Sequence, residues 1–161
     1  MTRTPLLVAL LVFAGCAGWF AFEAASVRSL DNAALADTRA TAEVIDQVGA
    51  GVKAVFSYDY ANLSRTERAA SDVLTGTAVT QYRTDFAAAR TQAEAGKLVR
   101  TTTIRSIGVQ TLRGDDATLL LFLDQQTLHT ESNQQESTAA QLTVTAHRTD
   151  GRWKLTALTP L

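Results

Sequence analysis

The sequence predicts an α+β fold in which helices come first and an antiparallel sheet follows. Apolar residues recur at three- and four-residue steps in the first part of the chain, and the period changes to two after Gly96. Asp150-Gly151 is the strongest hairpin signal, because both central positions of a type I′ turn need positive φ. This order of elements is typical of helices packed on one face of a curved antiparallel sheet.

The composition limits the classes of function. A chain of 161 residues has room for one ordinary domain and a short appendage. With a net charge of -1 and a pI near 6.1, it lacks the basic field that nucleic-acid binding requires, so we expect no nucleic-acid partner. One cysteine and two histidines cannot form an internal disulfide or a structural zinc site. We therefore expect no metal and no cofactor.

The run from Pro5 to Phe22 carries no charged side chain, and about 20 such residues span a bilayer. We predict a cytoplasmic tail at 1–4 and a transmembrane anchor at 5–22. A cleaved signal peptide and lipidation at Cys16 are the two alternatives. Arg3 lies on the short side, so the positive-inside rule places the rest of this single-pass protein of the cell (inner) membrane outside the cytoplasm.

A helical pattern runs from Glu23 to Tyr60, and we divide it into a stalk at 23–44 and the start of an exported domain at 45–161. Gly49 and Gly51 each cost a helix interior about 1 kcal/mol relative to alanine, which predicts a kink or break there.

Two shorter helices are expected next. Ser64-Arg65-Thr66-Glu67 matches a capping box, so a helix should start near Arg65 and end at Leu74-Thr75-Gly76. A second helix should run over 77–95, with Val79, Tyr82, Phe86 and Ala89 on one stripe, and stop at Gly96.

Four strands are predicted after this helix. Their ranges are 98–112, 118–130, 138–149 and 152–158, with a turn at Gly114-Asp115-Asp116 and a polar loop over 131–137. The apolar run Leu-Leu-Leu-Phe-Leu at 119–123 is typical of a central strand covered on both faces.

These features together resemble a known family. The helix running into Val55-Phe56-Ser57-Tyr58-Asp59-Tyr60, the ending Leu74-Thr75-Gly76, Tyr82, the strand with Leu-Leu-Phe-Leu, and the C-terminal segment from Asp150-Gly151-Arg152-Trp153 to Leu158-Thr159-Pro160-Leu161 match it in order. Over about residues 45–161, the chain is similar to the actinobacterial Mce-associated (mammalian cell entry-associated) membrane proteins. The polar stretch between the second and third strands departs from the family pattern.

The resemblance implies a cone-shaped, cystatin-like or nuclear transport factor two-like domain on a membrane anchor. It implies a non-enzymatic accessory protein that stabilises or assembles an Mce-type lipid or sterol import complex in the cell envelope. The implied partners are importer subunits or other Mce-associated proteins, and lipid as a further candidate. Two other functions stay open: a lipid carrier or sensor that uses the cone interior, and an anchored isomerase-like enzyme or hydrolase of the same fold.

Three aspartates are the candidates for a catalytic base. An isomerase-like site needs a carboxylate base and a tyrosine donor, for which Asp59, Asp85 and Asp124 are the acids to test. Each occupies a place where solvated carboxylates are ordinary, so we assign no catalytic residue. His129 and His147 have no ligand set beside them and are expected on the surface or in turns.

Five aromatic residues are the candidates for an interaction or pocket surface. Phe56 and Tyr60 are expected one helical turn apart, and Trp153 follows the hairpin, so a cluster at the mouth of the cone is one prediction; a buried core of aromatics is the other. The full candidate set is Phe56, Tyr58, Tyr60, Tyr82 and Trp153.

Overall fold

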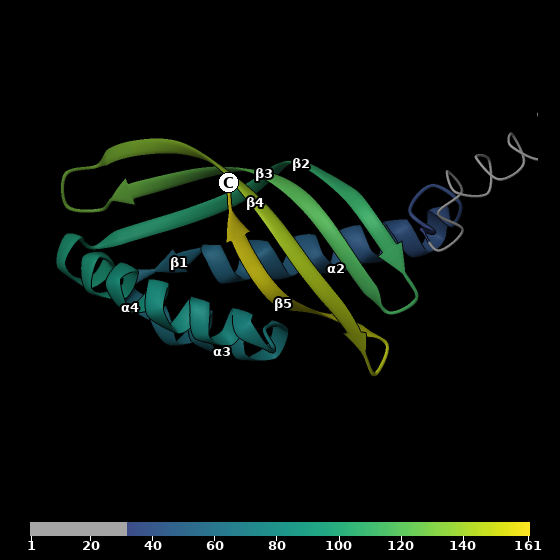
Figure 1. Ribbon diagram of the computed structural model, residues 1–161. Helices are drawn as coiled ribbons and strands as arrows, with labels where there is room; N and C mark the ends of the chain where they lie inside the picture. The colour runs from purple at the N-terminus through teal and green to yellow at the C-terminus, as the bar shows by residue number, and fades with distance from the viewer. Residues whose placement is uncertain (1–31) are drawn as a thin grey trace, which may run out of the picture. The chain divides into compact units, whose positions relative to one another are not determined.

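A five-stranded antiparallel sheet and three helices form the two layers of the computed structural model, which describes residues 32–161 (Figure 1). The strands are neighbours in chain order, β1-β2-β3-β4-β5. The helices are α2 (Thr38–Phe56), α3 (Leu63–Val73) and α4 (Thr77–Gly96), with the short 3-10 helix η1 (Tyr60–Asn62). The strands are β1 (Tyr58–Asp59), β2 (Leu98–Arg113), β3 (Asp116–His129), β4 (Gln134–Thr149) and β5 (Arg152–Pro160). The predicted α+β class is confirmed.

The membrane anchor predicted at 5–22 lies outside the described residues, as does the first part of the predicted stalk. Within residues 32–161 we find no helix that is both long and apolar enough to span a membrane.

Helix α2 starts later than the sequence pattern suggested. The Asp37 side chain accepts a hydrogen bond from the Ala40 amide at 2.9 Å and caps the helix at Thr38. Before it, the Asn32 side chain accepts a bond from the Leu112 amide at 2.9 Å, which ties the chain to β2. Residues 32–44, which we expected in a stalk, therefore pack on the domain.

Of the kink or break predicted at Gly49 and Gly51, the break is wrong, because α2 runs through both residues without interruption. Both glycines are buried against neighbouring elements. A β-carbon on Gly49 would lie 3.1 Å from Ile104 Cδ1, and one on Gly51 would lie 3.5 Å from Leu155 Cδ1. The close approach of helix and sheet offsets the conformational cost of glycine in the helix.

The concave face of the sheet and the inner face of α2 enclose the main core. Successive apolar residues of α2 recur at three- and four-residue steps and point to the sheet. The core side chains with no exposed surface include Val44, Val48, Val52, Leu119, Leu121, Val144 and Leu155. The space between α2 and the sheet is therefore filled by side chains rather than left as a ligand cavity.

Helix α3 begins at Leu63, and the predicted capping box at Ser64 is not formed. The Ser64 hydroxyl donates to the Asn62 side chain at 3.1 Å, while Glu67 pairs with Arg90 on α4. A tertiary partner has replaced the local one. Helix α4 starts at Thr77 as predicted but includes Gly96, and Lys97 takes the left-handed conformation with φ 47°.

The hairpin between β3 and β4 replaces much of the predicted polar loop. The turn occupies residues 130–133, and β4 starts at Gln134, paired with His129. Backbone pairing with β3 continues to the end of the hairpin, so the polar residues 134–137 are strand. By contrast, the turn at Asp150-Gly151 is confirmed, with φ values of 51° and 72°.

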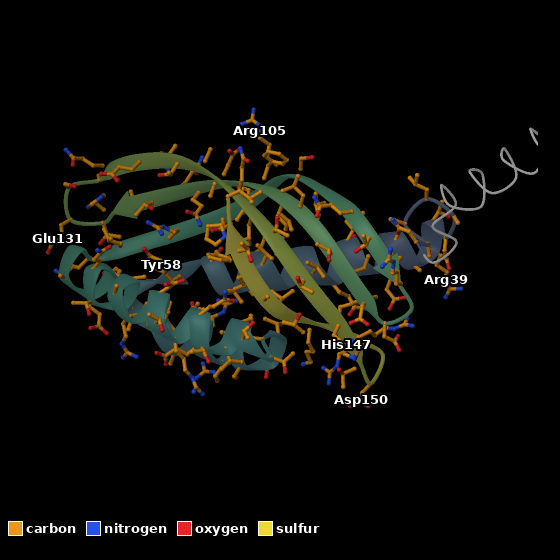
Figure 2. All side chains as sticks on the ribbon, in the orientation of Figure 1. Arg39, Tyr58, Arg105, Glu131, His147 and Asp150 are labelled. Atoms are coloured by element: carbon orange, nitrogen blue, oxygen red, sulfur yellow. The ribbon has the colours of Figure 1, made fainter. Side chains whose placement is uncertain are left out.

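Strand β3 is central in the sheet, as its apolar run predicted. The prediction that both of its faces are covered is wrong. Leu119, Leu121 and Leu123 point into the core, whereas Phe122 on the convex face is 37% exposed. The helices cover the concave face, and Arg105 stands on the other side of the sheet (Figure 2).

Candidate functional site

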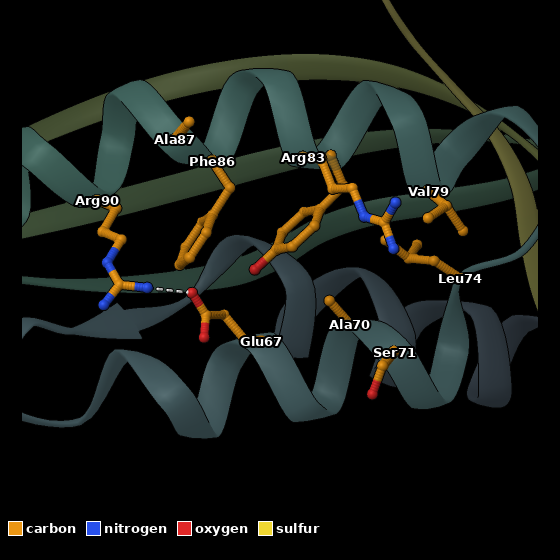
Figure 3. Close-up of a pocket in the computed structure, with 10 residues that line it drawn as sticks. Glu67, Ala70, Ser71, Leu74, Val79, Arg83, Phe86, Ala87 and Arg90 are labelled. Atoms are coloured by element: carbon orange, nitrogen blue, oxygen red, sulfur yellow. Dashed lines mark hydrogen bonds and ion pairs between the residues drawn. The ribbon is translucent and has the colours of Figure 1, made fainter.

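A groove with a volume of about 580 Å³ lies between α3 and α4 (Figure 3). Ten residues line it: Glu67, Ala70, Ser71 and Leu74 from the first helix and its end, and Val79, Tyr82, Arg83, Phe86, Ala87 and Arg90 from the second. We refer to these ten residues as the α3–α4 groove.

Helical periodicity builds the two walls. The lining residues of α3 are spaced three and four apart, and so are those of α4, so each helix presents one continuous stripe. Ala70 and Ala87 have short side chains on facing stripes, and this leaves the space between the helices open. Leu74, Val79 and Phe86 make much of the lining apolar.

Tyr82 lies at the centre of the lining and joins the two apolar clusters of the domain. Its ring stacks on Phe86, with centroids 4.8 Å apart and an angle of 16° between the planes. The hydroxyl is buried and has no hydrogen-bond partner among the described residues. Burial, reinforced by the nearby Glu67 carboxylate, raises the pKa of Tyr82, so the hydroxyl stays protonated.

Charged residues stand at the rim of the groove. Arg90 Nη1 lies 2.5 Å from Glu67 Oε1 across the groove, and Arg90 Nε lies 3.1 Å from Glu94 Oε1 one turn along α4 (Figure 3). The hydrogen bond to Glu94 and the two nearby carboxylates raise the pKa of Arg90. The Glu67–Arg90 pair is half exposed, so it bridges the helices without a large contribution to stability. Arg83, also in the lining, makes no ion pair within residues 32–161.

The five aromatic candidates do not form one cluster. Trp153 is buried in the main core, and Phe56 packs against that core. Tyr58 and Tyr60 belong to a second, smaller apolar cluster that includes Leu63 and Phe86. Tyr60 is not one helical turn from Phe56, because α2 ends at Phe56 and Tyr60 begins η1. Of the five, only Tyr82 lines the α3–α4 groove.

Tyr58 has a separate environment near the strand edge. Its ring lies under the Arg100 guanidinium, 5.2 Å from the ring centroid, at a shallow depression next to β1. Figure 2 shows Tyr58 near the start of the sheet, away from the turn at Asp150.

None of the acids considered for catalysis lines the α3–α4 groove with Tyr82. Asp59 accepts a hydrogen bond from the Ala61 amide at 2.9 Å and caps η1, and Asp124 pairs with Arg105 at 3.2 Å on the sheet. Asp85 is exposed on α4 and does not line the groove. None of these three carboxylates is hydrogen-bonded to a tyrosine in the described structure.

The histidines pair with acids at the surface. His129 Nε2 lies 3.4 Å from Glu136 Oε1, and His147 Nδ1 lies 2.7 Å from Asp116 Oδ1, both across strands. Within residues 32–161, no group of three His, Cys, Asp or Glu side chains could hold a metal ion.

The sequence pattern placed Tyr82 and Phe86 on one stripe, assigned Glu67 only to a capping box, and did not single out Arg83 or Arg90. The helical spacing of the α4 residues was a usable signal for one wall. Glu67 and Arg90 are 23 positions apart, so nothing local in the sequence pairs them.

The lining of the α3–α4 groove has the properties of a binding surface. An apolar floor between two helices accepts apolar side chains, and the charged rim adds orientation.

No family model matches the sequence, and neither does any curated protein. Solved structures share the fold. The periplasmic domain of DotI has a TM-score of 0.64 at 13% identity, over 78% of this chain and 97% of that one. An IcmL-like type IV secretion system protein from Legionella pneumophila has 0.62 at 12% identity, over 78% and 94%. A periplasmic fragment of TraM has 0.57 at 10% identity, over 74% and 96%.

At these identities the likeness concerns the fold alone. Helices packed on a curled antiparallel sheet of five strands place the domain among the cone folds similar to nuclear transport factor two. The predicted cone domain is confirmed at this level.

Proposed function

We propose that this chain is a non-enzymatic, membrane-anchored accessory protein that stabilises or assembles an Mce-type lipid or sterol importer. In this proposal residues 5–22 hold the chain in the membrane and residues 32–161 lie outside the cytoplasm. The observation that carries it is the filled cone interior, because a domain without an internal ligand cavity acts through its outer surface.

The similar structures support an extracytoplasmic domain of this kind. Two of them are periplasmic pieces, of DotI and of TraM, and a third is a type IV secretion system protein. The Mce assignment rests on the family resemblance over 45–161, which the fold does not address.

The α3–α4 groove is the surface that we assign to the importer. Two helices with a largely apolar groove between them accept the apolar stripe of a third helix. A partner helix would cover the exposed part of the groove lining, which includes Ala87. Arg83 provides a cation for an acidic side chain at the rim.

Neighbouring alanines on α4 provide a matched test of this surface. Ala87 lines the groove, and Ala88 is also exposed but does not line it. Ala87→Trp fills the groove with a large ring, whereas Ala88→Trp adds the same ring to the solvent side.

The experiment is purification of the full chain from its native membrane in mild detergent, with mass spectrometry of the proteins that accompany it. Wild type and Ala88→Trp should retain importer subunits, and Ala87→Trp should lose most of them. Deletion of the gene should lower the level of importer subunits in the membrane. Recovery of the wild-type chain alone, together with unchanged importer levels in the deletion strain, would refute the proposal.

A further inference from the structure

The backbone groups at the edges of the sheet are covered by other parts of the chain in some segments and not in others. Strand β2 forms one outer edge, apart from the short β1, and two register shifts interrupt its pairing with β3. Backbone groups of β2 are also covered by other parts of the chain. The Leu112 amide donates to Asn32, the Leu112 carbonyl accepts from Ala33 at 2.7 Å, and the Thr102 amide donates to the Ser57 hydroxyl at 3.0 Å. Such bulges and caps protect a sheet edge from pairing with another strand.

The outer edge of β5 is covered in the same way. Backbone groups along the strand bond to helix side chains and to the link between α3 and α4. The bonds are Trp153 N–H to Gln47 Oε1 at 2.8 Å, Leu158 N–H to Gln81 Oε1 at 3.0 Å, and Thr75 N–H to the Leu155 carbonyl at 2.9 Å.

The first half of β4 is the exception. Strand β5 pairs with β4 from Leu142 to Thr149, and the Leu161 amide adds one bond to the Gln141 carbonyl at 3.2 Å. Residues 134–140 of β4 pair with β3 on one side and with no strand of the described chain on the other. Six of these seven residues are exposed, and Ala140 is half-buried. We call residues 134–140 the open β4 edge.

The backbone of the open β4 edge is ready to accept a strand. Since Gln141 faces β5 through its carbonyl, every second residue before it faces the same side. The register between β3 and β4 has no shift, so this alternation is not interrupted. Gln135, Ser137 and Ala139 therefore present their N–H and C=O groups outward.

The usual protections of an edge strand are missing from this segment. It contains no proline, lysine or bulge. Its one charged residue, Glu136, lies 3.4 Å from His129 on the adjacent strand. The hairpin extends beyond the end of β5, with Glu131 at its tip (Figures 1 and 2).

We infer that the open β4 edge pairs with the same edge of a second copy of this chain, antiparallel about a two-fold axis at Ser137. The ends of the segment determine this register. Asn133, with φ 55°, turns the chain out of the strand at one end, and Leu161 occupies the position beside Gln141 at the other. Two segments of 134–140 fit side by side between these limits only if Ser137 faces Ser137 of the second copy.

The register is chemically consistent. Gln135 faces Ala139 of the second copy and Ser137 faces itself, so the outward N–H and C=O groups of both strands meet each other. Glu136 faces Thr138 rather than a second Glu136, so no like charges are directly opposite. The pairing joins two five-stranded sheets into one continuous sheet. It does not depend on the function proposed above.

Cysteine cross-linking of the full chain in mild detergent tests the register, in a Cys16→Ala background. Ser137→Cys places two sulfhydryls on paired residues about 5.5 Å apart at the Cα atoms, within disulfide range. Gln135→Cys alone should not cross-link, because its two copies would be about 13 Å apart, four residues along the strand. The double variant Gln135→Cys/Ala139→Cys should cross-link. Thr145→Cys, exposed on β4 but flanked by β5, is the matched control.

Proline substitution separates edge pairing from folding. The Ser137 N–H faces outward, so Ser137→Pro should abolish cross-linking of the Gln135→Cys/Ala139→Cys pair while the thermal unfolding of the chain stays nearly unchanged. Thr138→Pro removes an N–H that faces β3 and should lower the unfolding temperature.

Several-fold more dimer for Ser137→Cys than for Thr145→Cys and Gln135→Cys is the expected result. Equal cross-linking at residues 135 and 137, cross-linking that survives Ser137→Pro, or capture of a foreign protein in place of a second copy would each overturn the inference.

Discussion

Gly49 and Gly51, in the middle of α2, allow a direct test of how closely the helix lies on its neighbours. A β-carbon on Gly51 would lie 3.5 and 3.7 Å from two carbons of Leu155 and 3.7 Å from Val73 Cβ, which are ordinary contact distances. A β-carbon on Gly49 would lie 3.1 Å from Ile104 Cδ1, which is too close for an unshifted side chain. Alanine should therefore have different effects at two positions of one helix.

The magnitude follows from helix propensity and packing. Glycine costs a helix interior about 1 kcal/mol relative to alanine, so Gly51→Ala should stabilise the domain by about that amount. This corresponds to a rise of about 3–5 °C in Tm for a domain of this size. At Gly49 the same gain is opposed by about 0.5–1.5 kcal/mol for moving the Ile104 side chain from its rotamer, so the net change should be close to zero.

The assay is thermal and urea unfolding of the full chain, followed by the fluorescence of Trp153. This side chain is 5% exposed and reports on the core, and a Trp19→Phe background removes the other tryptophan. The order of stability should be Gly51→Ala above wild type, with Gly49→Ala close to wild type. Destabilisation by Gly51→Ala, or equal stabilisation by both substitutions, would refute the packing distances on which the reasoning depends.

Tyr82→Phe should stabilise the domain by about 1 kcal/mol in urea unfolding, because it removes a buried hydroxyl that has no partner among the described residues. The raised pKa of Tyr82 means that the unfolded chain loses this proton first as the pH rises past 10, so folded stability falls there, and Tyr82→Phe should fall less steeply in pH titrations of unfolding. Asp37→Ala should cost about 1 kcal/mol by losing the cap of α2, whereas Ser64→Ala should cost less than about 0.5 kcal/mol because Ser64 does not cap α3; equal losses in calorimetry would contradict this difference. Gly151→Ala should cost about 1 kcal/mol at φ 72°, and an unchanged unfolding temperature would argue against the type I′ turn.

Local patterns predicted much of the fold. The change of period after Gly96 marked the start of the sheet, and the apolar run at 119–123 identified the central strand. Asp150-Gly151 identified its turn because positive φ is a property of the residues themselves. These signals depend on neighbours in the chain, which a sequence displays directly.

Other predictions failed where a distant partner outweighed a local preference. Glu67 was expected to complete a capping box at Ser64 but pairs with Arg90 on the next helix. The polar residues 134–137 were expected in a loop but extend β4, because the backbone of β3 is available to pair with them. Backbone pairing does not require apolar side chains, so the polar composition of residues 134–137 did not indicate that they form a strand.

The candidate site illustrates the same division. The stripe of Tyr82 and Phe86 was visible in the sequence, but the groove also requires a wall from α3, which only the packing of the two helices supplies. The sequence also did not indicate that Trp153 is in one core cluster and Tyr58 in another.

The sequence by itself determined the α+β class, the order of the helices and strands, and the hairpin turn, because these follow from side-chain periodicity and backbone preferences over a few residues. Only the tertiary structure decided that α2 fills the cone, that the α3–α4 groove remains open, and that residues 134–140 have a strand on one side alone. The physical reason is that burial and edge pairing depend on which surfaces meet after folding, and those surfaces come from residues far apart in the chain.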